Sequence, residues 1–172
     1  MHHGTDSRGL HGYFQVGIAK SVPPPYLIRN SLDHGLEEPE ERRRKGKNPK
    51  GCIRMEMTLS QETLNILMTD DGRGINLLKV WQRALERNLV HEDESYTAID
   101  VANFILTPGF STAEKVTDIS GRGMGLDAVA NYLEKQGGSL ELVLEDPRAP
   151  HLGIVPLKFL ITLPSTHFQV VA

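Results

Sequence analysis

Two runs of alternating apolar residues near the middle of the chain constrain its fold more than any other feature. Apolar side chains recur at every second position over residues 53–59 and again over residues 64–68, with a short turn at residues 60–62 between them. Such alternation puts every second side chain on one face of a strand, and a short polar turn between two such runs is typical of a hairpin. The pattern predicts an antiparallel pair of strands.

A short helix is expected before this hairpin, over residues 26–34. Pro25 suits its first turn and Gly35 its C-terminal end. Its predicted packing face consists of Leu27, Ile28, Ser31 and Leu32. The charged stretch that follows, residues 37–50, is expected to be a solvated connection.

The second half of the chain adds helices and two more strands. Asn76 can cap a helix that starts at residue 77, and helical patterns also cover residues 98–106 and 126–136. Strands are predicted over residues 139–144 and 157–163. This order favours an α+β fold, a two-layer sandwich with helices on one face of a mostly antiparallel sheet.

Residues 107–125 carry no helical or strand period. A patternless stretch of this length in a compact domain is more often a lid or binding loop than a simple connection. Gly109 is a candidate hinge at one end of such a lid, and the glycines of residues 121–125 are candidates at the other.

Composition limits the possible classes of protein. The chain has 172 residues, 39% of them hydrophobic, and a formal net charge of −3, which fits one globular domain and gives no reason to expect nucleic acid as a partner. No apolar stretch is long enough to span a bilayer, so we expect no membrane insertion. With no apolar signal core and a single cysteine, Cys52, the cytoplasm is the simplest compartment.

Two smaller features have a structural interpretation. Cys52 has no neighbouring metal-ligand pattern, which favours a buried structural thiol. The basic run at residues 42–45 follows a run of glutamates, so a charge-balanced solvated segment is favoured over a nucleic-acid site.

The helix at residues 26–34 presents a polar face. Helical spacing aligns Tyr26, Asn30, Asp33 and His34. The amide oxygen of Asn30 is a hard ligand suited to Mg²⁺, which takes few protein ligands together with phosphates. His34 could contact phosphate oxygens, and Asp33 could hold a metal-bound water. The alternative is an amphipathic helix with a solvated polar side.

The sequence D-x-G-x-G at residues 70–74 ends the second strand of the hairpin. The carboxylate of Asp70 only accepts hydrogen bonds, so it would favour the exocyclic amine of adenine over the carbonyl oxygen of guanine. Gly72 and Gly74 would let the backbone approach the base. The alternative is an ordinary Asp-Gly turn.

Glycines at alternate positions over residues 121–125 directly precede a helix. Free backbone N–H groups at a helix N-terminus can bind an anion such as a triphosphate. Arg122 and Lys115 are candidate phosphate ligands, and solvated loop charges are the alternative. The spacing fits neither the Rossmann nor the P-loop pattern.

Four blocks occur in a fixed order: LIRNSLDHG at residues 27–35, DDGRGI at 70–75, PGFSTAE at 108–114 and SGRGMGLD at 120–127. Together they resemble the N, G1, F and G2 boxes of the ATP-binding domain of chemotaxis-type (CheA) histidine kinases. The resemblance covers residues 26–164.

The resemblance implies the Bergerat fold of the GHKL ATPases, with a mixed, mostly antiparallel sheet, a lid over the nucleotide, and transfer of a phosphoryl group from ATP to a histidine. It implies that Asn30 binds Mg²⁺. The catalytic candidates are Asn30, His34 and Tyr26. The nucleotide-binding candidates are Asn30, Asp33, His34, Asp70, Gly72, Gly74, Lys115, Gly121, Arg122, Gly123 and Gly125.

The chain departs from the family at three places. Tyr26 stands where the family carries histidine, and a tyrosine phenol is a poor general base at neutral pH. The prolines at residues 23–25 require the helix to begin late. Gly153 is the only remnant of the family's last glycine motif.

The predicted organisation is a poorly ordered leader at residues 1–20, the ATP-binding domain at 21–166 and a tail at 167–172. None of the seven histidines has the setting of a phosphoacceptor, so the acceptor is expected on another domain or protein. We expect a Mg·ATP-binding histidine kinase domain. The alternatives are a catalytically weak ATP-binding or protein-interaction module and a GHKL ATPase that hydrolyses ATP, which the lack of Glu at position 26 argues against.

Overall fold

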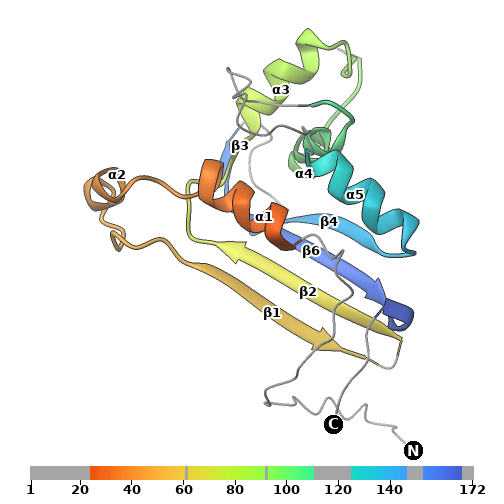
Figure 1. Ribbon diagram of the computed structural model, residues 1–172. Helices are drawn as coiled ribbons and strands as arrows, with labels where there is room; N and C mark the ends of the chain where they lie inside the picture. The colour runs from red at the N-terminus through yellow and green to blue at the C-terminus, as the bar shows by residue number, and fades with distance from the viewer. Residues whose placement is uncertain (1–23, 61, 92, 111–124, 147–152, 168–172) are drawn as a thin grey trace, which may run out of the picture.

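The computed structural model describes residues 24–60, 62–91, 93–110, 125–146 and 153–167 (Figure 1). Its elements, in chain order, are α1 (Pro24–Asn30), η1 (Ser31–Gly35), α2 (Pro39–Arg44), β1 (Ile53–Leu59), β2 (Thr63–Asp70), β3 (Ile75–Asn76), α3 (Leu77–Glu86), α4 (Ala98–Asn103), η2 (Phe104–Leu106), α5 (Leu126–Lys135), β4 (Ser139–Leu144), β5 (Ile154–Val155), β6 (Leu157–Pro164) and η3 (Ser165–His167). The element η1 is a π-helical turn, and η2 and η3 are 3₁₀ turns.

Four strands form the main sheet in the order β1-β2-β6-β4, and all three neighbouring pairs are antiparallel. In the central strand β2, Ile66 lies opposite Met57 of β1 and Ile161 of β6. Figure 1 shows α1 and α5 on one side of this sheet. The predicted α+β sandwich is therefore confirmed, with the helices in one layer and the sheet in the other.

The core lies between these two layers. Alternate residues of β2, namely Leu64, Ile66 and Met68, are at most 3% exposed. The helices contribute buried apolar side chains to the same cluster: Leu27, Leu77, Val80, Val101, Val129 and Leu133. This burial is what fixes α1 and the end of β2 relative to each other.

The hairpin of β1 and β2 is confirmed, but the two strands differ in burial, because β1 is mostly exposed. Met55, Met57 and Leu59 are 41%, 51% and 42% exposed. Their partners across the pair are buried residues of β2, so these side chains are on the core face of the sheet. They stay exposed because β1 is the edge strand and no helix of the described residues covers it.

The N-terminal helix changes from α-helical to π-helical after about two turns. It begins at Pro24, and from Ser31 it continues as a π-helical turn closed by a 2.7 Å hydrogen bond from the Leu36 amide to the Ser31 carbonyl oxygen. A π-turn contains more residues than an α-turn, so α-helical spacing no longer predicts the faces. Ser31 is buried as expected, whereas the predicted packing of Leu32 is wrong because that side chain is 58% exposed.

The expectation of a solvated connection over residues 37–50 is also wrong. This stretch contains α2, and Glu37 and Arg42 are only 4% and 1% exposed. Cys52 is exposed rather than buried, because it lies just before the uncovered edge strand.

Most other elements follow the prediction. The side chain of Asn76 caps α3 by accepting a hydrogen bond of 3.0 Å from the Lys79 amide, and α4 with η2, α5, β4 and β6 occupy the expected stretches. The small pair of β3 and β5 was not expected. No helix in the described part of the chain is long and apolar enough to cross a membrane.

Candidate functional site

Asp70 joins the first two predicted motifs. It is the last residue of β2, and its Oδ2 accepts a hydrogen bond of 2.7 Å from the Ser31 hydroxyl, while its Oδ1 accepts one of 3.0 Å from the Gly72 amide. The side chain is only partly buried. Both carboxylate oxygens are therefore oriented by the protein, and each retains acceptor capacity for a ligand.

The turn after Asp70 packs directly against the end of η1. The Arg73 amide donates a 2.8 Å hydrogen bond to the Gly35 carbonyl oxygen, and a Cβ at Gly72 would lie 2.2 Å from that same oxygen. Glycine at position 72 is thus required by the approach of the protein's own backbone. The structure also keeps the turn and the Asn30 helix at a fixed separation.

Gly74 has a second structural reason to be glycine. Its φ is +70°, and a Cβ there would lie 2.4 Å from the Val155 carbonyl oxygen. The strand pair of β3 and β5 begins immediately afterwards, so Gly74 lets the chain pass from the turn into that pair.

A group of charged side chains lies on the other side of the turn. We call Glu37, Arg42, Lys47 and Asp71 the turn cluster. Arg42 forms ion pairs with Glu37 at 3.1 Å and with Asp71 at 2.7 Å, and Lys47 pairs with Glu37 at 2.9 Å. The side chains of Arg42 and Glu37 are 1% and 0% exposed, so this is a buried ion pair between α2 and its N-terminal flank.

The pKa values of the two carboxylates of the turn cluster are both lowered. Burial opposes the charge of Glu37, but hydrogen bonds from Lys47, from its own backbone and from Lys45 outweigh that effect and lower its pKa to about 2. Burial likewise acts against the charge of Asp71, and hydrogen bonds from the Cys52 amide and from Arg42 lower its pKa. Both carboxylates are therefore ionised near neutral pH.

The polar side chains of the first motif lie along α1 and η1. Asn30 ends α1 and is half-buried, whereas Tyr26, Asp33 and His34 are exposed. Tyr26 and Asn30 are one helical turn apart within α1 and share a face. Asp33 forms an exposed ion pair with Arg29 at 3.1 Å.

These residues are compatible with one metal ligand rather than a protein cage. Within the described residues, no group of three histidine, cysteine or carboxylate side chains is placed to hold a metal ion. Mg²⁺ keeps several waters and usually takes one or two protein ligands together with substrate phosphates. A half-buried amide oxygen at Asn30 fits that requirement.

The third and fourth motifs meet at the two ends of residues 111–124. The Gly109 amide donates a 3.1 Å hydrogen bond to Oδ2 of Asp127 in α5, and Phe110 is buried with the guanidinium of Arg87 5.6 Å from its ring centre. Gly125 directly precedes α5. The candidates Lys115, Gly121, Arg122 and Gly123, and most of the predicted lid, lie outside the described residues.

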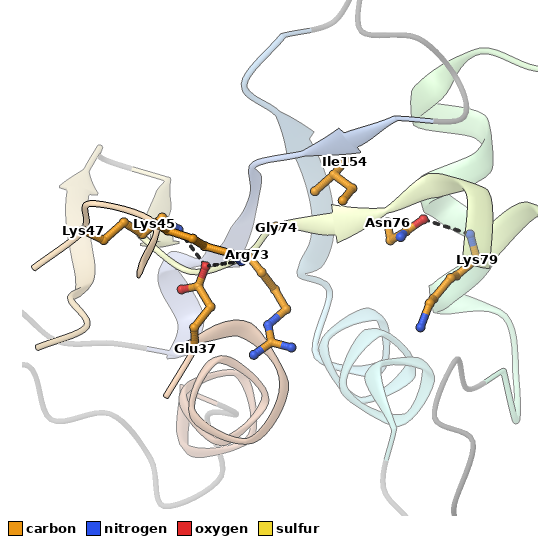
Figure 2. A pocket seen from close by; sticks show the side chains of 8 residues that line it. All are labelled: Glu37, Lys45, Lys47, Arg73, Gly74, Asn76, Lys79 and Ile154. Atoms are coloured by element: carbon orange, nitrogen blue, oxygen red, sulfur yellow. Dashed lines mark hydrogen bonds and ion pairs between the residues drawn. The ribbon is translucent and has the colours of Figure 1, made fainter. Parts of the chain in front are cut away.

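Figure 2 shows a pocket of about 370 Å³ beside the same turn. Its lining includes four cationic side chains and one carboxylate: Lys45, Lys47, Arg73, Lys79 and Glu37. Gly74, Asn76 and Ile154 complete it. Of the predicted site residues that the structure describes, only Gly74 lines this pocket, so the pocket is adjacent to the Asp70 site and not identical with it.

Sequence reasoning missed Ser31 and the turn cluster. Ser31 was assigned to a packing face, which hid the role of its hydroxyl. The run of glutamates before the basic residues indicated charge balance, but nothing in the local pattern indicates that Arg42 reaches Asp71, 29 residues away. The one available signal is Pro39, which starts α2 and is flanked by Glu38 and Glu40.

Residues 25–167 match the family described as histidine kinase-, DNA gyrase B-, and HSP90-like ATPases. The chain belongs to this family, which confirms the relationship predicted from the four blocks.

Individual relatives of the chain define a narrower group than the family description does. The chain is 46% identical over 122 residues to chemotaxis protein CheA of Bacillus subtilis, 42% over 120 residues to that of Rhizobium meliloti and 36% over 144 residues to that of Treponema pallidum. These alignments cover 70%, 70% and 84% of this chain but 18%, 16% and 17% of the relatives. The chain thus spans less than a fifth of the length of these three relatives.

Proposed function

We propose that this chain is the catalytic domain of a chemotaxis-type histidine kinase, which binds Mg·ATP and transfers its γ-phosphoryl group to a histidine on a separate domain or protein. The family and the CheA relatives support ATP binding. The observation that carries the proposal is the carboxylate of Asp70, oriented by Ser31 and Gly72 at the end of β2.

Base recognition would take place at Asp70. A carboxylate that is already held by two donors can accept a further hydrogen bond from the exocyclic amine of adenine. Guanine presents a carbonyl oxygen at that position, which a carboxylate repels. The orientation of Asp70 therefore favours adenine nucleotides over guanine nucleotides.

The phosphates would extend along the polar face of α1 and η1. Asn30 would hold Mg²⁺ through its amide oxygen, and His34 and Asp33 are exposed next to it in the chain. The bound metal would neutralise charge on the phosphate oxygens during transfer. The candidates at residues 115 and 121–125 are proposed to meet the triphosphate from the lid side.

The domain would contribute to catalysis mainly by positioning the reacting groups. A nitrogen of the acceptor histidine attacks the γ-phosphorus, a phosphorus–nitrogen bond forms, and the bond to the leaving oxygen of ADP breaks. Because the acceptor supplies the nucleophile, no strong base is required at Tyr26. Hydrolysis needs an activated water, so we expect intrinsic ATP hydrolysis to be slow.

Calorimetric titration with a non-hydrolysable ATP analogue, with and without Mg²⁺, tests the binding step. We expect saturable binding of one analogue per chain that tightens with Mg²⁺, and no comparable binding of a GTP analogue. Absence of adenine-nucleotide binding by the folded chain would refute the proposal.

A catalytically weak ATP-binding or protein-interaction module is the second candidate. The specific observation that favours it is tyrosine at position 26, on the same helical face as Asn30. Such a module would bind nucleotide as above and transfer nothing to an acceptor domain.

The location and partners follow from the kinase proposal. A domain of this kind would act in the cytoplasm, where ATP is available, and would require a phosphoacceptor domain supplied elsewhere. We propose neither nucleic acid nor a membrane as a partner.

A further inference from the structure

We propose that the turn cluster is a positioning device for base recognition, in which Lys47 and Arg42 hold the backbone after Asp70 so that its carboxylate faces the adenine. This inference rests on the proposed function, because it assumes that Asp70 meets the base. It assigns a role to residues 37–47, which lie between the first two sequence motifs and belong to neither.

The first argument is the set of backbone contacts. Lys47 Nζ donates to the carbonyl oxygen of Gly72 at 2.8 Å and to that of Asp71 at 3.1 Å. Arg42 Nη1 donates to the Asp71 carbonyl oxygen at 3.2 Å. Two cations therefore bind the two carbonyl groups that directly follow Asp70.

The second argument is that the cluster also fixes the Asp71 side chain. Arg42 Nη2 donates to Oδ2 of Asp71 at 2.7 Å, and the Cys52 amide donates to Oδ1 at 2.8 Å. The Asp71 amide in turn donates to the Cys52 carbonyl oxygen at 3.1 Å. The residue after Asp70 is thus held through its backbone and both carboxylate oxygens.

The third argument is the anchoring of the cations themselves. Arg42 is buried, its Nε donates to the Asn48 carbonyl oxygen at 2.6 Å, and its Nη1 donates to Glu37 at 3.1 Å. Glu37 Oε1 also accepts from Lys47 at 2.9 Å. A buried carboxylate that accepts from both cations fixes their positions, as a supporting partner does for a ligand residue.

On the opposite side, the turn contacts the end of η1. The Gly72 amide donates a hydrogen bond to Oδ1 of Asp70. The Arg73 amide donates one to the Gly35 carbonyl oxygen. The turn is thus held between η1 on one side and the turn cluster on the other. Loss of Lys47 would free the Gly72 carbonyl and loosen the amide that orients Asp70.

Lys45 provides a matched control on the same carboxylate. Its Nζ pairs with Glu37 Oε1 at 3.2 Å and with Glu41 at 2.8 Å. No hydrogen bond from Lys45 to the turn backbone occurs among the described residues. Lys45→Gln therefore removes one charge and one partner of Glu37 while leaving the contacts to Asp71 and Gly72 intact.

The experiment compares Lys47→Gln with Lys45→Gln in the full chain. We would measure affinity for ATP and for ITP, whose base carries a carbonyl oxygen in place of the adenine amine. We expect Lys47→Gln to lower the ratio of ATP affinity to ITP affinity by about three- to tenfold, which is the effect of one lost hydrogen bond. We expect Lys45→Gln to leave this affinity ratio unchanged. A merely electrostatic effect on the triphosphate would weaken both nucleotides equally.

Two further measurements decide whether Lys47 acts through Asp70. In a double-mutant cycle with Asp70→Asn, the loss of base preference should be strongly non-additive. Hydrogen exchange of the Gly72 amide should accelerate in Lys47→Gln and in the more conservative Arg42→Lys, relative to Lys45→Gln. An unchanged ATP-to-ITP ratio with unchanged Gly72 exchange in folded Lys47→Gln, or additive losses in the cycle, would overturn the proposal.

The exchange measurement also separates this inference from the proposed function. If the parent chain binds no adenine nucleotide, the proposed function fails, and with it the role in base recognition. Accelerated Gly72 exchange in Lys47→Gln would then still support a role of the cluster in holding the turn. If the parent binds ATP with the expected preference and Lys47→Gln changes nothing, only the positioning role fails.

Discussion

At the scale of single residues, the site depends on side chains that are fixed before a nucleotide arrives. Ser31 and Gly72 each donate to one oxygen of Asp70, so the carboxylate does not lose rotational freedom when it binds a base. A pre-oriented acceptor contributes more to affinity than a free one, because ordering it costs free energy only once, during folding.

Replacing Asp70 with asparagine should weaken adenine-nucleotide binding by about 1.5–3 kcal/mol, because the charge-assisted acceptor is lost and the amide can turn its NH₂ group toward the base. Isothermal titration of the variant with ATP gives the difference directly, and circular dichroism checks that the fold is retained. Unchanged affinity in a folded Asp70→Asn variant would remove Asp70 from the adenine site.

Asn30→Ala should abolish the dependence of nucleotide affinity on Mg²⁺. A half-buried amide oxygen is the one ligand proposed for the metal, and alanine offers no replacement. The measurement is the ATP affinity at zero and at saturating Mg²⁺, in the parent and in the variant. If Mg²⁺ still tightens binding to Asn30→Ala to the same extent, the metal is held elsewhere.

At the scale of elements, α2 and the turn after β2 are coupled by buried charge. The carboxyl of Glu37 is buried between Arg42 and Lys47, and its pKa is lowered from 4.5 to about 2. A carboxylate with a depressed pKa in the folded state stabilises the fold above its ordinary pKa, and this contribution is lost as the pH falls through the folded-state value.

We therefore expect the free energy of unfolding to fall as the pH drops from about 5 to 2, and the slope to be shallower in Glu37→Gln than in the parent. Urea unfolding at several pH values in this range measures it. Glu40→Gln is the control, because the ion pair of Glu40 within the described part of the chain is with the exposed Arg43 on the same helix. Equal slopes for Glu37→Gln and the parent would show that this buried pair does not contribute to the acid sensitivity.

The elements that could be predicted from sequence are those specified locally. The cap at Asn76, the hairpin of β1 and β2, and the end of α5 each depend on residues within a few positions. The position of Asp70 at the end of a strand was predictable for the same reason, and its role in binding adenine stays a prediction. The π-turn at Ser31, the burial of Arg42 and the exposure of Leu32 depend on packing between distant segments, which no local period encodes.

At the scale of the whole molecule, the proposed reaction brings ATP on this domain together with an acceptor histidine from elsewhere. The chain corresponds to less than a fifth of its CheA relatives, and its proposed reaction requires a histidine supplied by another domain or protein. Activity must therefore be measured with a phosphoacceptor domain present.

Tyr26→His separates the kinase from the binding module. If the chain is a kinase, the parent should already transfer phosphate to a supplied acceptor domain, because the acceptor histidine brings its own nucleophile. The substitution would then mainly raise ATP hydrolysis, since imidazole is the better base at neutral pH. Radiolabel transfer and ADP release, measured on both proteins, distinguish these effects. Transfer by Tyr26→His and none by the parent would favour the binding module.

The open edge of the sheet has a consequence for handling the protein at high concentration. An edge strand with unpaired backbone groups and uncovered apolar side chains is a template for further strands, and β1 carries Met55, Met57 and Leu59 in that state. We expect the chain to lose colloidal stability through this strand. Met57→Lys should lower light scattering on concentration while leaving nucleotide affinity intact, and Thr58→Lys, on the opposite face of the strand, should lower it less. Equal benefit from both variants would assign the improvement to net charge, and the aggregation then would not start at the apolar face of β1.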